Sequence, residues 1–248
     1  GTGPKAGGPL YLYRLLSTRP ADAIEQSFQR SDAGNAPDSR LRENLLKPLE
    51  SFKAWAASSQ QNELAQLCEQ FARQSQSGIT RLLAGPTGER NSYTILPASC
   101  LVGSEMCIRD SSYTILPREH VLCLADSEAD LLTQLAAVLA VGSSALVLDG
   151  EPGKSLRARL PKDVQSRIKL VADWNKDDVV FDAVLHHGDS DQLRGICEQV
   201  AKRAGAIVGV HGLSSGETSV ALERLVIERA LSVNTAAAGG NASLMTIG

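Results

Sequence analysis

The second half of this sequence predicts an α/β fold with a Rossmann-like parallel sheet, preceded by an α-helical connector. From His120 onward, short apolar runs that resemble buried strands alternate with helix-length segments. The runs are apolar throughout rather than at every second residue, which is typical of parallel strands covered by helices on both faces. Residues 17–84 differ, because they are polar, rich in Gln and Ser, and periodic in the manner of helices.

The amino-terminal part predicts a loop, an edge strand and then helices. Residues 1–16 are rich in Gly and Pro and then alternate as LYLYRL, which is typical of a loop that leads into an edge strand. Pro20 suits the first turn of a short helix that extends to Arg30. Apolar residues at helical spacing mark two further helices: Leu41, Leu45, Leu49, Phe52 and Trp55 or Ala56 in the first, and Leu64, Leu67, Cys68, Phe71 and Ala72 in the second.

Five apolar runs after His120 are the expected strands. They cover residues 121–125, 145–149, 167–172, 181–187 and 206–212.

Helix starts lie between these runs. Ser127 with Asp130, and Asp189 with Gln192, have the spacing of a side chain that caps the first turn of a helix. The second of these helices carries an apolar stripe of Leu193, Ile196, Cys197 and Val200, and residues 222–233 predict a last helix or strand.

Residues 131–148 contain no charged side chain and are long enough to be considered as a membrane helix. Thr133 and Gln134 interrupt one end of this segment, and the Gly142-Ser143-Ser144 sequence stops a helix. The segment therefore predicts a buried helix, a turn and a buried strand, and no membrane span.

Charge and cysteine content exclude several classes of protein. The net charge is -3 and the pI is near 5.9, so nothing directs the chain toward nucleic acid or an anionic membrane. Five cysteines without a CxxC pair form neither a disulfide framework nor a zinc motif, which favours a reducing, cytoplasmic environment. The first residues also lack the pattern of a signal peptide.

No nucleotide motif is complete. Residues 150–155 read GEPGKS, but Leu148 stands where a phosphate-binding loop needs its first glycine, so a surface turn is expected. No GxGxxG follows any strand. We expect no cofactor to bind this segment.

No catalytic or metal-binding set is evident either. His186 and His187 are adjacent on a strand, so their side chains point to opposite faces and cannot share one metal ion. Cys68 and Cys197 lie on apolar helix stripes and Cys123 lies within a strand, which predicts inert core thiols rather than a nucleophile. We therefore assign no catalytic, cofactor-binding or metal-ligating residue.

The carboxyl-terminal residues 232–248 are small, uncharged and rich in Ala and Gly. They are too polar for a core helix and too apolar for a solvated tail. Gly239 and Gly240 leave the backbone free to approach another surface closely. We expect a docking segment, with a plain solvated tail as the alternative.

Several stretches together resemble the carboxyl-terminal part of the proline utilization A family. They are GTGPKAGGPLYLYRLLSTRP, LLAGPTGERNSYTILPREHVLCLAD, LTQLAAVLAVGS, FDAVLHHGDSDQLR and IERALSVNTAAAGGNASLMTIG. Members of that family are bifunctional bacterial enzymes that join an FAD-dependent proline dehydrogenase to an NAD-dependent dehydrogenase of the aldehyde dehydrogenase superfamily. They convert proline to glutamate and pass the intermediate through an internal tunnel.

The resemblance implies a division of the chain. Residues 1–16 resemble the end of the catalytic aldehyde dehydrogenase domain, residues 17–84 a helical connector, and residues 85–248 the family's non-catalytic aldehyde-dehydrogenase-like domain. The NAD site, the catalytic cysteine and the FAD barrel of the parent enzyme would then lie upstream of this segment.

The resemblance also implies partners. Residues 229–248 would dock on the upstream dehydrogenase domain of the same polypeptide and help to close the tunnel. The residues expected to matter for this contact are Asn234, Gly239, Gly240, Asn241 and Leu244. Whether the protein forms a homo-oligomer stays open. The alternative function is that of a free-standing α/β module that binds a nucleotide or a small acid.

The hexapeptide SYTILP occurs twice, at residues 92–97 and 112–117. A structural repeat would recur as a whole supersecondary unit, whereas only six residues recur here. Removing residues 98–117 joins GERNSYTILP to REHVLCLAD, the continuous form that the family pattern implies. Back-translation of EMCIRDS also resembles the end of a transposase sequencing adapter. We interpret residues 98–117 as a library artefact that loops out of the fold, with a genuine loop insertion as the alternative.

Overall fold

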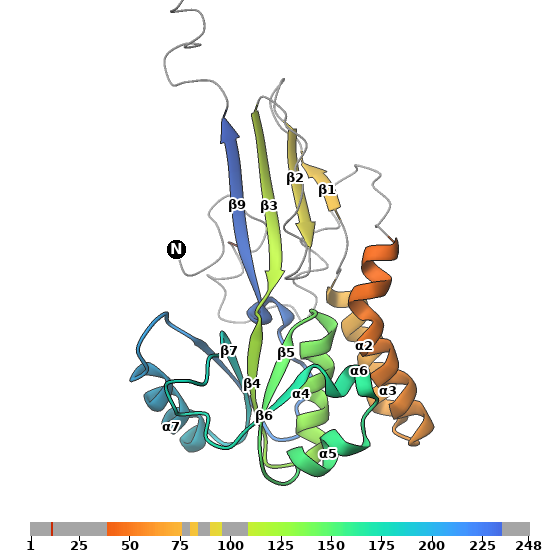
Figure 1. Cartoon of the computed structure of the whole chain (residues 1–248), viewed down its shortest axis with the longest axis vertical. Helices are drawn as coiled ribbons and strands as arrows, with labels where there is room; N and C mark the ends of the chain where they lie inside the picture. Colours follow the sequence, from red (N-terminus) through yellow and green to blue (C-terminus); the bar gives the residue numbers. More distant parts are fainter. Residues whose placement is uncertain (1–10, 12–38, 76–79, 84–89, 96–108, 235–248) are drawn as a thin grey trace, which may run out of the picture.

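The computed structural model describes residues 11, 39–75, 80–83, 90–95 and 109–234 (Figure 1). Tyr11 lies in a turn. The rest of the predicted edge strand in residues 1–16 and the helix predicted from Pro20 to Arg30 lie outside this part of the chain.

Two of the predicted helices are confirmed in the connector. They are α2 (Ser39–Ser58), which includes Pro48, and α3 (Asn62–Ser75). The two helices pack against each other and against a third helix, α4 (Glu128–Ala140). Their predicted apolar positions form the contact, since Phe52, Ala56, Cys68 and Phe71 are almost fully buried.

A five-stranded parallel sheet forms the centre of the molecule. Its strands are β4 (His120–Leu124), β5 (Ser144–Leu148), β6 (Ile168–Val171), β7 (Ala183–His187) and β8 (Gly209–Leu213). The order is β6-β5-β4-β7-β8, and every neighbouring pair is parallel. The chain adds strands on one side of β4 and then on the other, so the predicted Rossmann-like sheet is confirmed.

The helices between these strands are α4, α5 (Gly153–Arg159), α6 (Lys162–Gln165) and α7 (Ser190–Ala201). Both predicted caps are present. Ser127 Oγ accepts a hydrogen bond from the Asp130 N–H at the start of α4. Asp189 and Gln192 form a complete capping box at the start of α7.

Helix α4 explains why residues 131–148 are so apolar. Every residue of α4 from Asp130 to Ala140 is buried, because the parallel sheet covers one side of the helix and α2 and α3 cover another (Figure 1). A turn with Gly142 at φ +82° then leads into β5. Among the helices that the structure describes, none has the length and apolar character needed to cross a membrane.

A second sheet extends from the first (Figure 1). Its strands are β1 (Thr80–Leu83), β2 (Arg90–Ile95), β3 (Arg109–Pro117) and β9 (Val226–Asn234), in the order β1-β2-β3-β9. The β2–β3 pair is parallel and the other two pairs are antiparallel. The predicted last helix or strand is a short 3-10 helix, Leu222–Leu225, followed by β9.

The expectation that residues 98–117 loop out is wrong for residues 109–117, which form β3. Residues 98–108 lie outside the described part. The second SYTILP copy has the same sequence as the first and directly precedes β4, so it is as able to form a strand as the first copy. Ile115 and Leu116 are buried there, which favours incorporation over exposure.

The prediction that Cys197 is a core thiol is also wrong, because its side chain is exposed. Of the apolar stripe on α7, only Val200 is fully buried, while Leu193 and Ile196 are half-buried. Cys197 lies at the margin of the stripe. α7 packs against β8, the edge strand of the sheet.

Candidate functional site

The residues predicted for the docking tail are mostly outside the described part of the chain. Asn234 is the last residue of β9, where it pairs with Arg109 of β3. Gly239, Gly240, Asn241 and Leu244 lie beyond the described residues. The docking role of these five residues therefore stays a prediction.

The fold itself indicates where a ligand would be expected. In open parallel sheets, ligands bind beyond the carboxyl ends of the strands, where the strand order reverses. Here the reversal lies between β4 and β7, which are neighbours although β5 and β6 come between them in sequence. A ligand is therefore expected near the carboxyl ends of β4 and β7 and the start of α4.

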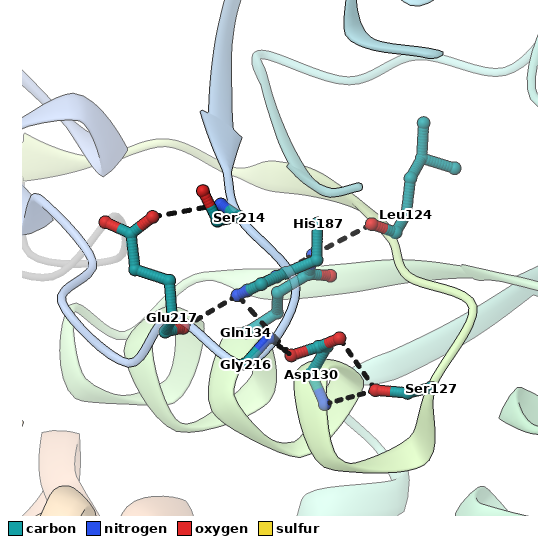
Figure 2. A network of polar contacts seen from close by, with 8 residues as sticks. All are labelled: Leu124, Ser127, Asp130, Gln134, His187, Ser214, Gly216 and Glu217. Atoms are coloured by element: carbon teal, nitrogen blue, oxygen red, sulfur yellow. Dashed lines mark hydrogen bonds and ion pairs between the residues drawn. The ribbon is translucent and has the colours of Figure 1, made fainter. Parts of the chain in front are cut away.

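A buried amide and imidazole connect these elements (Figure 2). Gln134 of α4 donates from Nε2 to the Leu124 carbonyl at 2.9 Å, and its Nε2 also lies 2.9 Å from His187 Nδ1. The carbonyl can only accept, so it fixes which side of the amide points toward it. Nε2 therefore donates to His187 Nδ1 as well.

The other nitrogen of His187 completes the tautomer assignment. Nε2 lies 2.8 Å from the Glu217 carbonyl oxygen, to which it must donate. His187 thus accepts at Nδ1 and donates from Nε2, and Nε2 also lies 3.9 Å from Asp130 Oδ1. Both of its ring nitrogens are used within the chain, and the side chain is buried.

The buried carboxylate of Asp130 holds the loop after β8 in place (Figure 2). It accepts a hydrogen bond from the Gly216 N–H at 2.8 Å and another from Ser127 Oγ at 2.7 Å. Glu217 in turn accepts from the Ser214 N–H through its own carboxylate at 2.9 Å. Gly216 has φ +79°, a conformation that favours glycine.

The residues at the strand reversal therefore bond to one another. The loop that carries Ser214, Gly216 and Glu217 is bonded to His187 at the end of β7 and to Asp130 in the first turn of α4. A dinucleotide site would present backbone N–H groups and a glycine-rich turn to a pyrophosphate here. Residues 124–128 instead read LADSE, without a glycine.

His186 lies on the opposite face of β7, as its position next to His187 predicts. It is buried, and neither ring nitrogen has a hydrogen-bond partner among the described residues. Burial lowers its pKa, while the carboxylates of Asp126 and Asp189 act in the opposite direction. The two histidine side chains thus have separate surroundings on opposite faces of β7.

The GEPGKS segment is a surface turn followed by the short helix α5. Gly153 packs closely against β5, since a Cβ atom placed there would lie 2.5 Å from Val147 Cγ1 and 2.8 Å from the Leu148 carbonyl oxygen. Lys154 forms an ion pair with Asp149 at 3.4 Å. The glycine of this GKS therefore serves close packing, and the predicted turn is confirmed.

Two of the three described cysteines are core thiols. Cys68 and Cys123 are buried, and burial raises the pKa of both thiols, that of Cys68 to about 12. Such thiols remain protonated near neutral pH and are poor nucleophiles.

One group of potential metal ligands was not predicted from the sequence. Glu119, His120 and Asp182 lie at the amino-terminal ends of β4 and β7, with one ligand atom of each within 4.8 Å of the others. Asp182 already accepts a hydrogen bond from the His120 N–H at 3.1 Å, and its charge acts on the neighbouring Arg118. The group is partly exposed and internally bonded, which gives no case for a metal centre.

Comparison with known proteins finds relatives that align over the whole of this chain. No family model matches the chain. The chain is 53% identical over 248 residues to the bifunctional protein PutA of Salmonella typhimurium and 52% identical over 248 residues to that of Escherichia coli. Both alignments include 100% of this chain and 17% of the relative, so the chain spans 17% of the length of those relatives.

Solved structures of the same group align with this chain only in part. A structure of proline utilization A with proline bound in remote sites matches 78% of this chain and 21% of that chain, with 21% identity and a TM-score of 0.48. The sequence similarity over the whole chain is what establishes the relationship. The chain therefore belongs to the PutA family.

Proposed function

We propose that this segment is the scaffold part of a proline-catabolic bifunctional enzyme and has no catalytic activity of its own. In this proposal the parent enzyme is cytoplasmic and oxidises proline to glutamate by way of 1-pyrroline-5-carboxylate, with FAD and NAD bound upstream. The segment supports the NAD-dependent oxidation of glutamate semialdehyde. Sequence identity of 53% over the whole chain supports the assignment to such an enzyme.

The strand reversal supports the non-catalytic part of the proposal. At this point Asp130, Gln134 and His187 are bonded to the chain itself, and the loop after β4 lacks the glycines of a dinucleotide site. Both described buried cysteines are protonated near neutral pH. These contacts among the described residues support a scaffold role for the Rossmann-like sheet.

The proposal also assigns roles to regions of the chain. Residues 1–16 end the catalytic dehydrogenase domain, residues 17–84 connect it to the domain of residues 85–248, and residues 98–117 are foreign to the natural protein. Residues 229–248 dock on the upstream dehydrogenase domain and close the channelling tunnel. Asn234, Gly239, Gly240, Asn241 and Leu244 make the contact.

Calorimetry with NAD on the 248-residue chain tests the non-catalytic role. We expect no heat of binding, and no reduction of NAD when glutamate semialdehyde is added. Binding of NAD in the micromolar range would favour the free-standing nucleotide-binding module instead. Turnover of the semialdehyde would contradict the scaffold role outright.

The docking role is tested in a full-length PutA protein. Gly240→Trp should lower dehydrogenase activity or lengthen the lag before NADH appears from proline, because a large side chain prevents close approach of the backbone. Gly209→Trp, at an exposed glycine with no atom near its Cβ position and no positive φ, controls for the addition of an indole side chain. Unchanged kinetics in the Gly240 variant would contradict the docking role.

A further inference from the structure

Residues 92–95 of the first SYTILP copy and residues 112–115 of the second lie side by side in the second sheet, on β2 and β3 (Figure 1). They pair in parallel with each residue opposite its own duplicate: Ser92 with Ser112, Tyr93 with Tyr113, Thr94 with Thr114 and Ile95 with Ile115. On the outer sides, β1 pairs antiparallel with the first copy and β9 pairs antiparallel with the second.

This register has a geometric consequence. Two identical strands in parallel, in-register pairing are related by a translation of one strand spacing, about 4.8 Å. In a parallel pair, two directly opposed residues point their backbone N–H and C=O groups the same way. If one residue points these groups toward the neighbouring strand, the opposed residue points its own groups away from the first strand. A given hexapeptide position therefore points its backbone groups in the same direction in both copies.

It follows that one copy has the right pattern for both outer partners. The backbone groups that the first copy directs toward β1 are those that the second copy directs toward β2. The groups that the first copy directs toward β3 are those that the second copy directs toward β9. A single SYTILP strand could bond β1 on one side and β9 on the other without changing either register.

We propose that the two copies are equivalent occupants of one strand position, and that removal of residues 98–117 transfers the pairing of β9 from the second copy to the first. The sheet then becomes a three-stranded antiparallel sheet with β1 and β9 at its edges. Thr94 takes the place of Thr114 opposite Arg229, while it keeps Thr80 on its other side.

The parallel sheet should not change. Removing residues 98–117 or residues 92–111 leaves the same sequence, in which SYTILP is followed by Arg118 and β4. The Arg118 N–H donates to the Leu225 carbonyl and anchors that junction. The first copy also supplies the Ile-Leu pair whose equivalents, Ile115 and Leu116, are buried.

Cysteine pairs test the transfer directly. In a Cys197→Ser chain without residues 98–117, Thr94→Cys with Arg229→Cys should form a disulfide, since opposed residues of antiparallel strands lie within its reach. In the full chain with Cys100, Cys107 and Cys197 replaced by Ser, that pair is two strand spacings apart, about 9.6 Å, and should stay reduced. Thr114→Cys with Arg229→Cys should form the bond there instead. Peptide mass spectrometry identifies each bond.

Two further measurements keep the result unambiguous. Tyr93→Cys with Arg229→Cys is one residue out of register and should not cross-link in the shortened chain. Urea unfolding of the shortened chain without cysteine changes should give a stability no lower than that of the full chain. Absence of the Thr94–Arg229 bond, a bond in the shifted pair, or failure of the shortened chain to fold would each overturn the proposal.

Discussion

Helices α4 and α7 begin alike and end in different surroundings. Each follows one of the two strands that meet at the strand reversal, β4 for α4 and β7 for α7, and each has its first turn capped by a side chain, Ser127 for α4 and Asp189 for α7. Yet every residue of α4 from Asp130 onward is buried, whereas Val200 is the one fully buried residue of α7.

The difference lies in what covers each helix. The sheet lies on one side of α4 and the connector helices α2 and α3 lie on another, so α4 can be apolar around most of its circumference. Nothing in the described chain covers the outer side of α7, and its sequence is correspondingly polar there. The distribution of apolar residues around a helix therefore indicates how many of its sides are covered by other elements. Two capped helices of one sheet can differ completely in this respect.

Truncation of a leucine on each helix should show the largest effect. Leu135 on α4 is 1% exposed, so Leu135→Ala should lower the free energy of unfolding by about 3 kcal/mol, which combines lost burial with a cavity. The matched change on α7 is Leu193→Ala, at a half-buried position, with an expected loss of about 1 kcal/mol. Urea unfolding measures both, and equal losses would break the comparison.

Removal of the buried amide on α4 should come next. Gln134→Leu leaves the Leu124 carbonyl and His187 Nδ1 without their donor, and should cost about 2 kcal/mol of stability. The control is Gln199→Leu on the exposed side of α7, for which a change within about 0.5 kcal/mol is expected. If both variants unfold at the wild-type urea concentration, the bonds around His187 contribute nothing to stability.

The two helix caps should have smaller and similar effects. Ser127→Ala and Asp189→Ala should each cost about 1 kcal/mol, because each removes the acceptor for a backbone N–H in the first helical turn. Conservative replacements, Ser127→Thr and Asp189→Asn, should restore most of the loss. Thermal unfolding followed by circular dichroism distinguishes these outcomes, and a loss near zero for either alanine variant would contradict the cap it tests.

The smallest effect should be a pH dependence on the α7 face of the sheet. Burial lowers the pKa of His186 below 6.5, so the unfolded chain binds a proton more readily than the folded chain. The contribution of His186 to stability is therefore complete above pH 6.5 and is lost as the pH falls below that value. His186→Gln should lose less stability than the wild type between pH 7.5 and pH 5.5. Parallel stability curves for the two proteins would rule out this contribution.

Local signals were enough for much of the fold. The caps at Ser127 and Asp189 and the strands around Leu122 and Leu146 each depend on residues within a few positions of one another. The position of the strand reversal was harder to predict from the sequence, because it requires β7 to lie beside β4 rather than beside β6.

The candidate site could be predicted only in part. The opposite orientation of His186 and His187 follows from strand alternation. The bond between Asp130 and Gly216 joins residues 86 positions apart, and no local pattern indicates which loop will reach a carboxylate at that distance. The same reason explains why the group formed by Glu119, His120 and Asp182 was missed.

By itself, the sequence determined the α/β class, the capped helices and membership of the PutA family, because periodicity, capping and similarity to relatives are all written in the order of residues. The tertiary structure decided the exposure of Cys197, the closure of the strand reversal by the loop at Gly216, and the place of the second SYTILP copy in a strand. Each of these depends on which distant segments become neighbours, and on the free energy of burying one surface rather than another.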